Sequence, residues 1–399
     1  MSELSYLEKL LDGVEVEWLP LSKVFNLRNG YTPSKTKKEF WANGDIPWFR
    51  MDDIRENGRF LGNSLQKISS CAVKGGKLFP ENSILISTSA TIGEHALITV
   101  PHLANQRFTC LALKESYADC FDIKFLFYYC FSLAEWCRKN TTMSSFASVD
   151  MDGFKKFLIP RPCPDNPEKS LAIQSEIVRI LDKFTALTAE LTAELTMRKK
   201  QYNYYRDKLL SFEEGGVEWK TLGEIVKMRA GQHISARNIV DGKEGDFVYP
   251  CFGGNGIRGY VKEKSHDGEH LLIGRQGALC GNVQRMKGQF YATEHAVVVS
   301  AMQGIDIDWA FHMLTTMNLN QYASKSAQPG LAVGKLQELK LLVPSIERQK
   351  YIAKILDKFD TLTSSITEGL PREIELRQKQ YEYYRDLLFS FPKPETASN

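Results

Sequence analysis

The chain has 399 residues, of which 43% are hydrophobic and 25% charged, a composition typical of a globular protein with two or three domains. Its formal net charge of +3 is too small to indicate nucleic-acid binding by itself, although Lys and Arg are locally dense across Lys23–Lys77 and Lys220–Lys287. No apolar run reaches the length of about eighteen residues that a membrane span needs, and residues 1–11 carry charges where a signal peptide would be apolar. We therefore expect a cytoplasmic protein.

The eight cysteines include no CxxC pair and no cysteine–histidine quartet with the spacing of a zinc site. We expect no metal ion and a reducing compartment, with the cysteines acting as small buried apolar residues. His233, His266, His270 and His295 also lack the spacing of metal ligands, so we expect them in polar or packing roles.

In the first half of the chain, short strands precede a long apolar helix. Strand composition is found at Ile46–Ile54, Ser83–Thr88 and His95–Val100, and Cys120–Asn140 is typical of a buried helix. These elements predict a mixed α/β globule.

A second, longer helix follows in residues 168–214. Its apolar residues advance by steps of four and three, which is typical of the a/d seam of a coiled coil. The seam consists of Ile173, Ile177, Ile180, Phe184, Leu187 and Leu191, and it resumes at Tyr202, Tyr205, Leu209 and Phe212.

The second half of the chain repeats this order. Strands are expected at Phe247–Phe252, His270–Gln276, Gly281–Met286 and Tyr291–Ser300, and a helix at Asp306–Ala323. A long helix then runs through residues 346–399, with the seam Ile352, Ile355, Phe359, Leu362, Ile366, Tyr381, Tyr384, Leu388 and Phe391. Gly369 and Pro371 interrupt this second seam and predict a kink or local unwinding.

The two halves are copies of one unit. ILDKF occurs at Ile180–Phe184 and at Ile355–Phe359, and QYNYYRD at 201–207 returns as QYEYYRD at 380–386. Residues 17–34 match 218–235, residues 149–160 match 333–344, and only the middles of the globules diverge. A repeat of this length indicates duplicated domains rather than a solenoid.

We therefore expect an α+β protein with a pseudo-two-fold internal repeat. Two mixed α/β domains, 1–167 with a short N-terminal helix and 215–345, are separated by two long helices, 168–214 and 346–399 with its C-terminal tail. The two seams fit an antiparallel coiled-coil pair that acts as a spacer between the domains. The alternative is that each helix packs only on its own half of the chain.

The ordered motifs resemble those of one family. GYTPS before FWANGDIPWFRMDDI, STSATIG before NQRF, IGRQGALCGNV before FYATEHAVVV, the SAQPGL loop and both ILDKF…QYxYYRD helices resemble the specificity subunit of a type I restriction-modification system. The resemblance implies a non-catalytic subunit whose two target-recognition domains each read one half of a split, asymmetric site in double-stranded DNA. It also implies that the spacer helices dock two modification (methyltransferase) subunits, and that restriction (translocase/nuclease) subunits join for cleavage.

The chain lacks the motifs of the chemistry that such a complex performs. It has no GxxxxGK(S/T) loop and no DPPY or NPPY loop, so we expect no cofactor here and adenosylmethionine and ATP on the partner subunits. GGNGIRG lacks the strand, spacing and helix of a dinucleotide site and is interpreted as a tight turn. Thr293, Glu294 and His295 have no nucleophile or second carboxylate beside them.

Base edges are read by amide and guanidinium groups, whereas phosphates are met by hydroxyls, backbone N–H groups and cations. Candidate DNA contacts in the first globule are Tyr31, Thr32, Ser34, Lys35, Arg50, Ser87, Thr88, Ser89, Thr91, Asn105, Gln106 and Arg107. Those in the second are Gln232, His233, Arg237, Asn255, Arg258, Tyr260, Arg275, Gln276, Asn282, Ser324, Lys325, Ser326 and Gln328. We interpret Trp41, Trp48, Trp136 and Trp309 as core residues.

Two other functions remain alternatives. A self-sufficient restriction-methylation enzyme would need the methyltransferase loop, which is absent. A coiled-coil scaffold that binds only protein would have no use for the basic, amide-rich loops of the globules.

Overall fold

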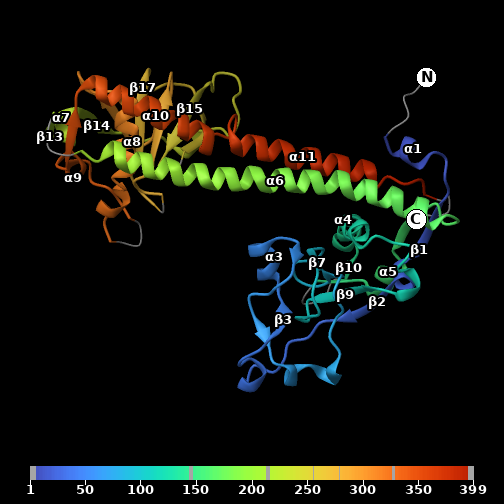
Figure 1. Cartoon of the computed structure of the whole chain (residues 1–399). Helices are drawn as coiled ribbons and strands as arrows, with labels where there is room; N and C mark the ends of the chain where they lie inside the picture. The colour runs from blue at the N-terminus through green and yellow to red at the C-terminus, as the bar shows by residue number, and fades with distance from the viewer. Residues whose placement is uncertain are drawn as a thin grey trace, which may run out of the picture. The chain divides into compact units, whose positions relative to one another are not determined.

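The computed structural model describes residues 6–142, 147–212, 216–254, 256–277, 279–325 and 329–393. The chain divides into two compact units, the first comprising residues 1–189 and 376–399 and the second residues 190–375. Figure 1 shows the elements of both units.

The first unit is built on a five-stranded sheet with the order β2-β9-β6-β7-β4. These strands are β2 (Phe25–Asn29), β9 (Phe108–Leu113), β6 (Ser83–Ser87), β7 (His95–Ile98) and β4 (Phe60–Leu61). All five residues of β6 are buried, because both faces of the sheet are covered. Ile84 and Ile86 point into one hydrophobic cluster and Leu85 into another, as the period of a strand requires.

A smaller sheet in the first unit has the order β5-β3-β8, with β5 (Lys67–Ile68), β3 (Ile46–Phe49) and β8 (Leu103–Ala104). The strand expected at Ile46–Ile54 is therefore wrong in its second part, since β3 ends at Phe49 and the helix α3 (Met51–Asn57) follows. The buried carboxylate of Asp53 causes this change, because it accepts the backbone N–H of Arg50 at 2.6 Å and so caps the helix.

The remaining elements of the first unit connect the sheets to the helices. The antiparallel pair β1 (Val16–Pro20) and β12 (Leu158–Pro162) closes the domain, and α4 (Ile123–Lys139) packs on the large sheet with nine buried residues. The others are α1 (Tyr6–Leu11), α2 (Leu21–Val24), α5 (Met151–Lys156), β10 (Thr141–Thr142), β11 (Ser148–Val149), η1 (Lys38–Phe40), η2 (Ser70–Ala72), η3 (Lys74–Gly76) and η4 (Glu115–Tyr117).

The second unit has the same plan. Its four-stranded sheet has the order β14-β20-β17-β18 and its three-stranded sheet the order β16-β15-β19, while β13 pairs with β21 as β1 pairs with β12. The elements are β13 (Val217–Thr221), α7 (Leu222–Ile225), β14 (Val226–Ala230), η5 (Ala236–Asn238), β15 (Tyr249–Gly253), β16 (Gly256–Val261), β17 (Glu269–Gly274), β18 (Val283–Lys287), β19 (Tyr291–Ala292), β20 (Ala296–Ala301), α8 (Ile307–Thr316), η6 (Leu319–Tyr322), α9 (Val333–Gln337) and β21 (Lys340–Pro344).

One strand expected in the second unit is two strands. Tyr291–Ser300 divides into β19, which pairs in parallel with β15, and β20, which lies between β14 and β17. The chain turns between them, where the N–H of Ala296 donates to the carbonyl of Thr293 at 3.0 Å. The helix expected at Asp306–Ala323 is likewise shorter, because α8 ends at Thr316 and η6 follows it.

The long helices contribute further buried residues to the hydrophobic clusters of both units. The helix α6 (Pro167–Leu210) is continuous over 44 residues, whereas the second copy consists of α10 (Ile346–Ser364) and α11 (Leu370–Leu388). In the first unit α11 runs antiparallel to α6 (Figure 1), and Phe184 stacks on Tyr384 with ring centroids 5.5 Å apart. In the second unit Tyr205 of α6 stacks on Phe359 of α10 at 5.6 Å. The expected α+β fold with two mixed domains and long antiparallel helices is confirmed.

The kink expected near Gly369 is also confirmed, since residues 365–369 separate α10 from α11. Gly369 has a φ of +81°, and a Cβ atom there would lie 2.4 Å from the carbonyl oxygen of Thr361. Ile366, expected in the helical seam, lies in this link and is 79% exposed. The seam expectation is wrong at this residue, because the helix ends before it.

Candidate nucleic-acid interface

A groove of about 740 Å³ opens in the first unit, lined by residues within 32–42, 48–55 and 105–107 and by Gln66. It brings together six of the predicted DNA contacts, which are Thr32, Lys35, Arg50, Asn105, Gln106 and Arg107. Its other lining residues are Lys38, Trp41, Ala42, Trp48, Met51, Asp52, Arg55 and Gln66. We call this the first-unit groove.

Two loops meet on one side of the groove because their backbones are in close contact. The N–H groups of Gly30 and Tyr31 donate to the carbonyls of Phe108 and Ala104, both at 2.8 Å. A Cβ atom on Gly30 would lie 2.1 Å from the carbonyl oxygen of Asn105, so only glycine allows this approach. The loop after β2 therefore lies against the loop before β9, and the hydroxyl of Thr32 hydrogen-bonds to the side chain of Gln106.

The opposite side of the groove is formed by the end of β3 and the start of α3. The guanidinium of Arg50 lies 5.9 Å from the ring of Trp48 and 3.8 Å from the carboxylate of Asp52. Trp41 meets Trp48 edge-to-face at 5.1 Å, and its indole N–H donates to the carbonyl of Ser34 at 3.0 Å. The guanidinium of Arg50 therefore lies against the indole ring of Trp48 in the wall of the groove.

The charge of the groove suits a polyanion. Its lining includes five cations, Lys35, Lys38, Arg50, Arg55 and Arg107, against the single carboxylate of Asp52. Amide groups of Asn105, Gln106 and Gln66 lie among them. Cations meet phosphate oxygens, and amides and arginines can pair with base edges, so the residue types fit double-stranded DNA.

Six polar or aromatic lining residues were not predicted as DNA contacts, which are Lys38, Trp41, Trp48, Asp52, Arg55 and Gln66. Lys38 lies in the same basic run as the predicted Lys35, so the sequence carried a signal for it. Arg55 and Gln66 lie in segments where no contact was predicted. Trp41 was expected in the core. It is only partly buried and packs on the core with one side while it lines the groove with the other, so the core interpretation is incomplete.

The predicted serine and threonine contacts lie elsewhere. Ser87 is buried and its hydroxyl donates to the carbonyl of Ser89 at 2.9 Å, and the hydroxyl of Thr88 pairs with that of Thr109 at 3.0 Å. Thr91 lines a separate hollow of about 710 Å³, together with Arg55, Arg59 and Arg138. This loop is therefore not part of the first-unit groove.

Two further predicted residues have local roles in the first unit. The hydroxyl of Tyr31 donates to the carbonyl of Ala72 at 3.1 Å and accepts the N–H of Lys74 at 2.8 Å, so it ties the loop to the helix η3. Ser34 is exposed beside the groove and hydrogen-bonds to Thr36 at 2.8 Å.

In the second unit a hollow of about 420 Å³ brings together two predicted residues, Arg258 and Gln276, with His295. The Nδ1 atom of His295 lies 2.8 Å from Oε1 of Gln276. The glycine-rich segment supplies the rest of the lining, since β15 ends at Gly253 and β16 begins at Gly256. Gly253 and Gly256 pair across these antiparallel strands, while the predicted turn includes Asn255, which lies outside the described residues. His295 was not predicted to lie with these residues.

The other predicted residues of the second unit are dispersed. His233 is exposed and its Nδ1 lies 2.8 Å from the carboxylate of Glu294, while the hydroxyl of Ser324 accepts the N–H of Gly330 at 3.0 Å. Those that are exposed without lining the hollow are Gln232, Arg237, Asn282 and Lys325, and those that are partly buried are Tyr260 and Arg275. Asn255, Ser326 and Gln328 lie outside the described residues.

Comparison with known proteins then identifies the family. The sequence profile described as "Type I restriction modification DNA specificity domain" matches residues 13–197 and again residues 214–376. The chain belongs to the specificity subunits of type I restriction-modification systems. It is 91% identical over 374 residues to the EcoprrI specificity subunit of Escherichia coli, covering 92% of this chain and 93% of that protein.

More distant relatives agree. A second type I restriction enzyme specificity subunit of Escherichia coli is 41% identical over 437 residues, with 100% of both chains covered. The crystal structure of an S subunit from M. genitalium has the same fold, with a TM-score of 0.58 and 18% identity over 98% of this chain and 99% of that chain.

The packing positions predicted for the spacer helices of this specificity subunit differ in exposure. Ile177, Ile352 and Tyr381 are buried, and Ile180, Phe184, Leu191, Tyr202, Ile355, Phe359 and Leu362 are partly buried. Leu187, Tyr205 and Tyr384 are 37%, 42% and 41% exposed, and the last two rings stack on phenylalanines. The predicted seam therefore mixes buried, partly buried and exposed positions, and Tyr205 and Tyr384 are among the exposed ones.

The exposed rings form the same arrangement in both copies of the helix. Tyr204 is 60% exposed and meets Tyr205 at 5.3 Å with an interplanar angle of 75°. Its counterpart Tyr383 is 65% exposed and meets Tyr384 at the same distance and angle. Aromatic residues are enriched at protein–protein interfaces relative to the rest of a protein surface. We call these the tyrosine pairs.

Among the residues that the structure describes, no group of three or more His, Cys, Asp or Glu residues could hold a metal ion. Within the same residues, no helix has the length and apolar character needed to cross a membrane.

Proposed function

We propose that this chain is the non-catalytic DNA-reading subunit of a type I restriction-modification complex, and that its two domains each read one half of a bipartite, asymmetric target. The observation that carries the proposal is the duplication itself, because near-identical helices support two domains whose grooves differ in residue content. Dissimilar grooves on a repeated frame fit two different half-sites.

The recognition domains correspond to residues 1–167 and 215–345, and the spacer helices to residues 168–214 and 346–399. In the first domain the proposed contacts are the six predicted residues of the first-unit groove together with Lys38 and Arg55. In the second they are centred on Arg258 and Gln276. Among the contacts predicted outside these hollows, the proposal retains those that are exposed on loops, which are Ser34, Gln232, His233, Arg237, Asn282, Ser324 and Lys325.

The tyrosine pairs support a second part of the proposal, that the helices dock two methyltransferase subunits. Because the two pairs have the same geometry, they offer the same surface twice to one kind of partner. Restriction subunits join this assembly for cleavage, and adenosylmethionine and ATP bind the partner subunits. The complex acts on DNA in the cytoplasm.

The proposal is tested by expressing the chain with its methyltransferase subunits and mapping methylated bases in host DNA. We expect one split sequence with two defined parts and an undefined gap of fixed length. Methylation without any sequence preference would contradict the proposal, and salt-independent failure of the full complex to bind DNA would favour the protein-only scaffold.

Docking is tested separately with the variants Tyr204→Ala, Tyr383→Ala and the double variant. If each pair holds one subunit, native mass spectrometry will show one methyltransferase bound in each single variant and none in the double variant. Two subunits bound to the double variant would contradict this docking surface.

A further inference from the structure

Each recognition domain is joined to its spacer helix by the same two contacts. The first contact is a buried glutamine on the helix. Oε1 of Gln174 in α6 accepts the backbone N–H of Asp122, and Oε1 of Gln349 in α10 accepts that of Asp306, both at 2.9 Å. Asp122 and Asp306 are the N-cap residues of α4 and α8, so each glutamine holds the start of the equivalent domain helix.

The second contact is the aspartate of the repeated ILDKF motif. The carboxylate of Asp182 accepts hydrogen bonds from the Tyr128 hydroxyl and the Lys124 ammonium, both at 2.7 Å. Its counterpart Asp357 lies 2.7 Å from Nε2 of His312 and pairs with the guanidinium of Arg285. The helix residues are the same in both units, while the domain residues differ.

The domain residues nevertheless occupy equivalent positions. Tyr128 follows its N-cap by six residues (128 − 122), and His312 does the same (312 − 306). Nε2 of His312 lies 2.7 Å from the Asp357 carboxylate, which can only accept, so this ring nitrogen is the donor. Nδ1 faces the Tyr202 hydroxyl at 3.5 Å, and burial lowers the pKa of the ring. A hydroxyl in one domain and an imidazole in the other thus donate to the same carboxylate.

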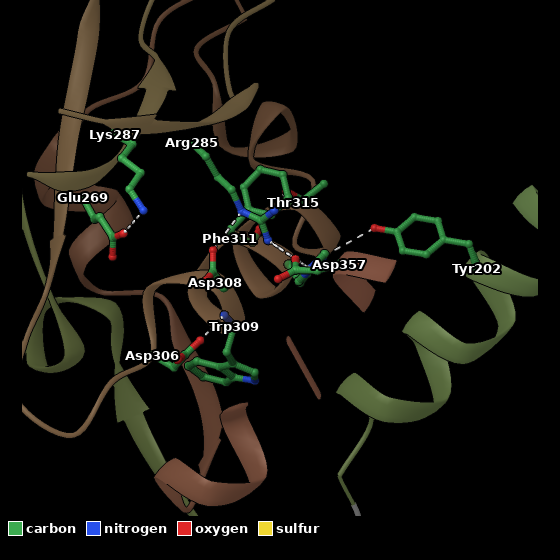
Figure 2. A network of polar contacts seen from close by, with 11 residues as sticks. Tyr202, Glu269, Arg285, Lys287, Asp306, Asp308, Trp309, Phe311, Thr315 and Asp357 are labelled. Atoms are coloured by element: carbon green, nitrogen blue, oxygen red, sulfur yellow. Dashed lines mark hydrogen bonds and ion pairs between the residues drawn. The ribbon is translucent and has the colours of Figure 1, made fainter. Parts of the chain in front are cut away.

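The positive charge comes from a different element in each unit. Lys124 lies two residues after its N-cap on α4, but the equivalent residue on α8 is Asp308. In the second unit Arg285 of β18 supplies the cation instead, with Nε 3.1 Å from Asp308 and the guanidinium 4.1 Å above the ring of Phe311 (Figure 2). The domain helix thus has a carboxylate in the second unit where it has an ammonium group in the first. Arg285 on the neighbouring strand β18 supplies the positive charge instead.

We infer that Gln174, Asp182, Gln349 and Asp357 are positioning residues that fix the orientation of each recognition domain on its helix, and hence the gap between the half-sites. The inference rests on the proposed function. It follows that a domain is compatible with the helix only if it supplies one neutral donor and one cation to the aspartate. Removing the cation leaves a partly buried carboxylate without its countercharge and allows the domain to shift.

The test uses the complete complex with its methyltransferase subunits and DNA duplexes carrying the mapped target. The gap is kept at its native length or changed by one base pair, and initial methylation rates are compared. We expect Arg285→Ala to lower the preference for the native gap about tenfold, the size typical of coupled contacts. The bases required in each half-site should not change, because neither groove is altered.

A compensating variant separates positioning from general stability. In Arg285→Ala, Asp308 and Asp357 are left as two carboxylates, whereas Arg285→Ala with Asp308→Lys rebuilds the arrangement of Lys124 and Asp182. We expect the double variant to regain the native gap preference. The matched control is Lys287→Ala on the same strand, because Lys287 pairs with the exposed Glu269 at 2.9 Å and does not touch the helix (Figure 2).

If Arg285→Ala prevents assembly, Tyr128→Phe provides the same test in the first unit. This substitution removes only the hydroxyl group that donates a hydrogen bond to Asp182. The inference is overturned if these variants leave the gap preference unchanged, or if they lower methylation equally at every gap length. A wild-type complex that methylates no bipartite target would instead overturn the proposed function, and the inference with it.

Discussion

The first-unit groove depends on a few side chains whose chemistry is set by their neighbours. Arg50 is fixed by Trp48 and Asp52, whereas Arg107 is exposed on the loop between β8 and β9. Arginine can pair with guanine through two hydrogen bonds or meet a phosphate, and either contact is lost on truncation. Substitutions of single groove residues are therefore expected to have distinct effects on DNA binding.

We predict that Arg107→Ala weakens binding of the complex to its target by about 1–3 kcal/mol, or roughly fivefold to 150-fold in Kd. Titrations at one fixed salt concentration measure this change. Lys155→Ala removes a cation that pairs with Asp152 on α5 and does not line the groove, so it should leave Kd nearly unchanged. Equal losses in both variants would show that only overall charge matters.

A buried histidine gives the first unit an acid-sensitive stability. Burial, with the nearby charge of Arg59, lowers the pKa of His95 to about 3. Its unfolded pKa is about 6.5, so between these values the unfolded chain binds the proton and the folded chain does not. The contribution of neutral His95 to the unfolding free energy is fully present above pH 6.5 and is lost as the pH drops from 6.5 toward 3.

The unfolding free energy of the wild type decreases between pH 7 and pH 5. We predict that His95→Gln makes this decrease smaller by about 2 kcal/mol, since glutamine does not titrate. Urea unfolding at both pH values measures it. Part of the loss should remain, because burial also lowers the pKa of His102, to about 4. The same pH dependence in variant and wild type would contradict the assignment.

The sequence predicted part of the groove for a physical reason. Thr32, Lys35, Asn105, Gln106 and Arg107 lie in polar segments between apolar strands, where exposed loops are expected. Arg55 could not be assigned, because its position depends on α3, and that helix replaces the expected strand through the single capping contact of Asp53. His295 was missed because the turn between β19 and β20 was not recognised.

At the scale of elements, the helices were the most predictable part of the chain. The steps of three and four along α6 and α10 reflect the helical period directly, so these elements follow from the sequence. Tyr291–Ser300 was harder, because both of its parts are buried and an apolar run carries no sign that the chain changes sheets within it. Period alone cannot reveal such a turn.

The link between α10 and α11 provides a prediction at this scale. Gly369→Ala places a Cβ atom against the Thr361 carbonyl at a positive φ, so we expect a loss of about 1–3 kcal/mol in unfolding free energy. Thermal unfolding measures it as a lower Tm. Gly242→Ala is the matched control, because a Cβ atom added there would meet no atom within 4 Å and the φ of Gly242 is not positive.

At the scale of the whole molecule, the duplication separates what is constant from what varies. The helices repeat their sequence, their glutamine and aspartate contacts and their tyrosine pairs. The domains differ in groove residues and even in the sign of the charge two residues after the N-cap of the domain helix, where Lys124 corresponds to Asp308. This division predicts that one domain can change its specificity without affecting the other.

Helix length supplies a further prediction. Inserting four residues between Leu191 and Gln201 lengthens α6 by about 6 Å, since each helical residue adds about 1.5 Å. Methylome mapping should then show a longer gap with both half-sites unchanged. A changed base within either half-site would contradict the role of the helices as a spacer.

The most direct test of the account replaces residues 14–167 with the corresponding domain of another specificity subunit and maps methylation by the reconstituted complex. We predict that one half of the target changes to the donor's half-site, while the other half and the gap stay as they are in the wild type. A change in both halves would contradict the claim that two separable readers share one helical frame.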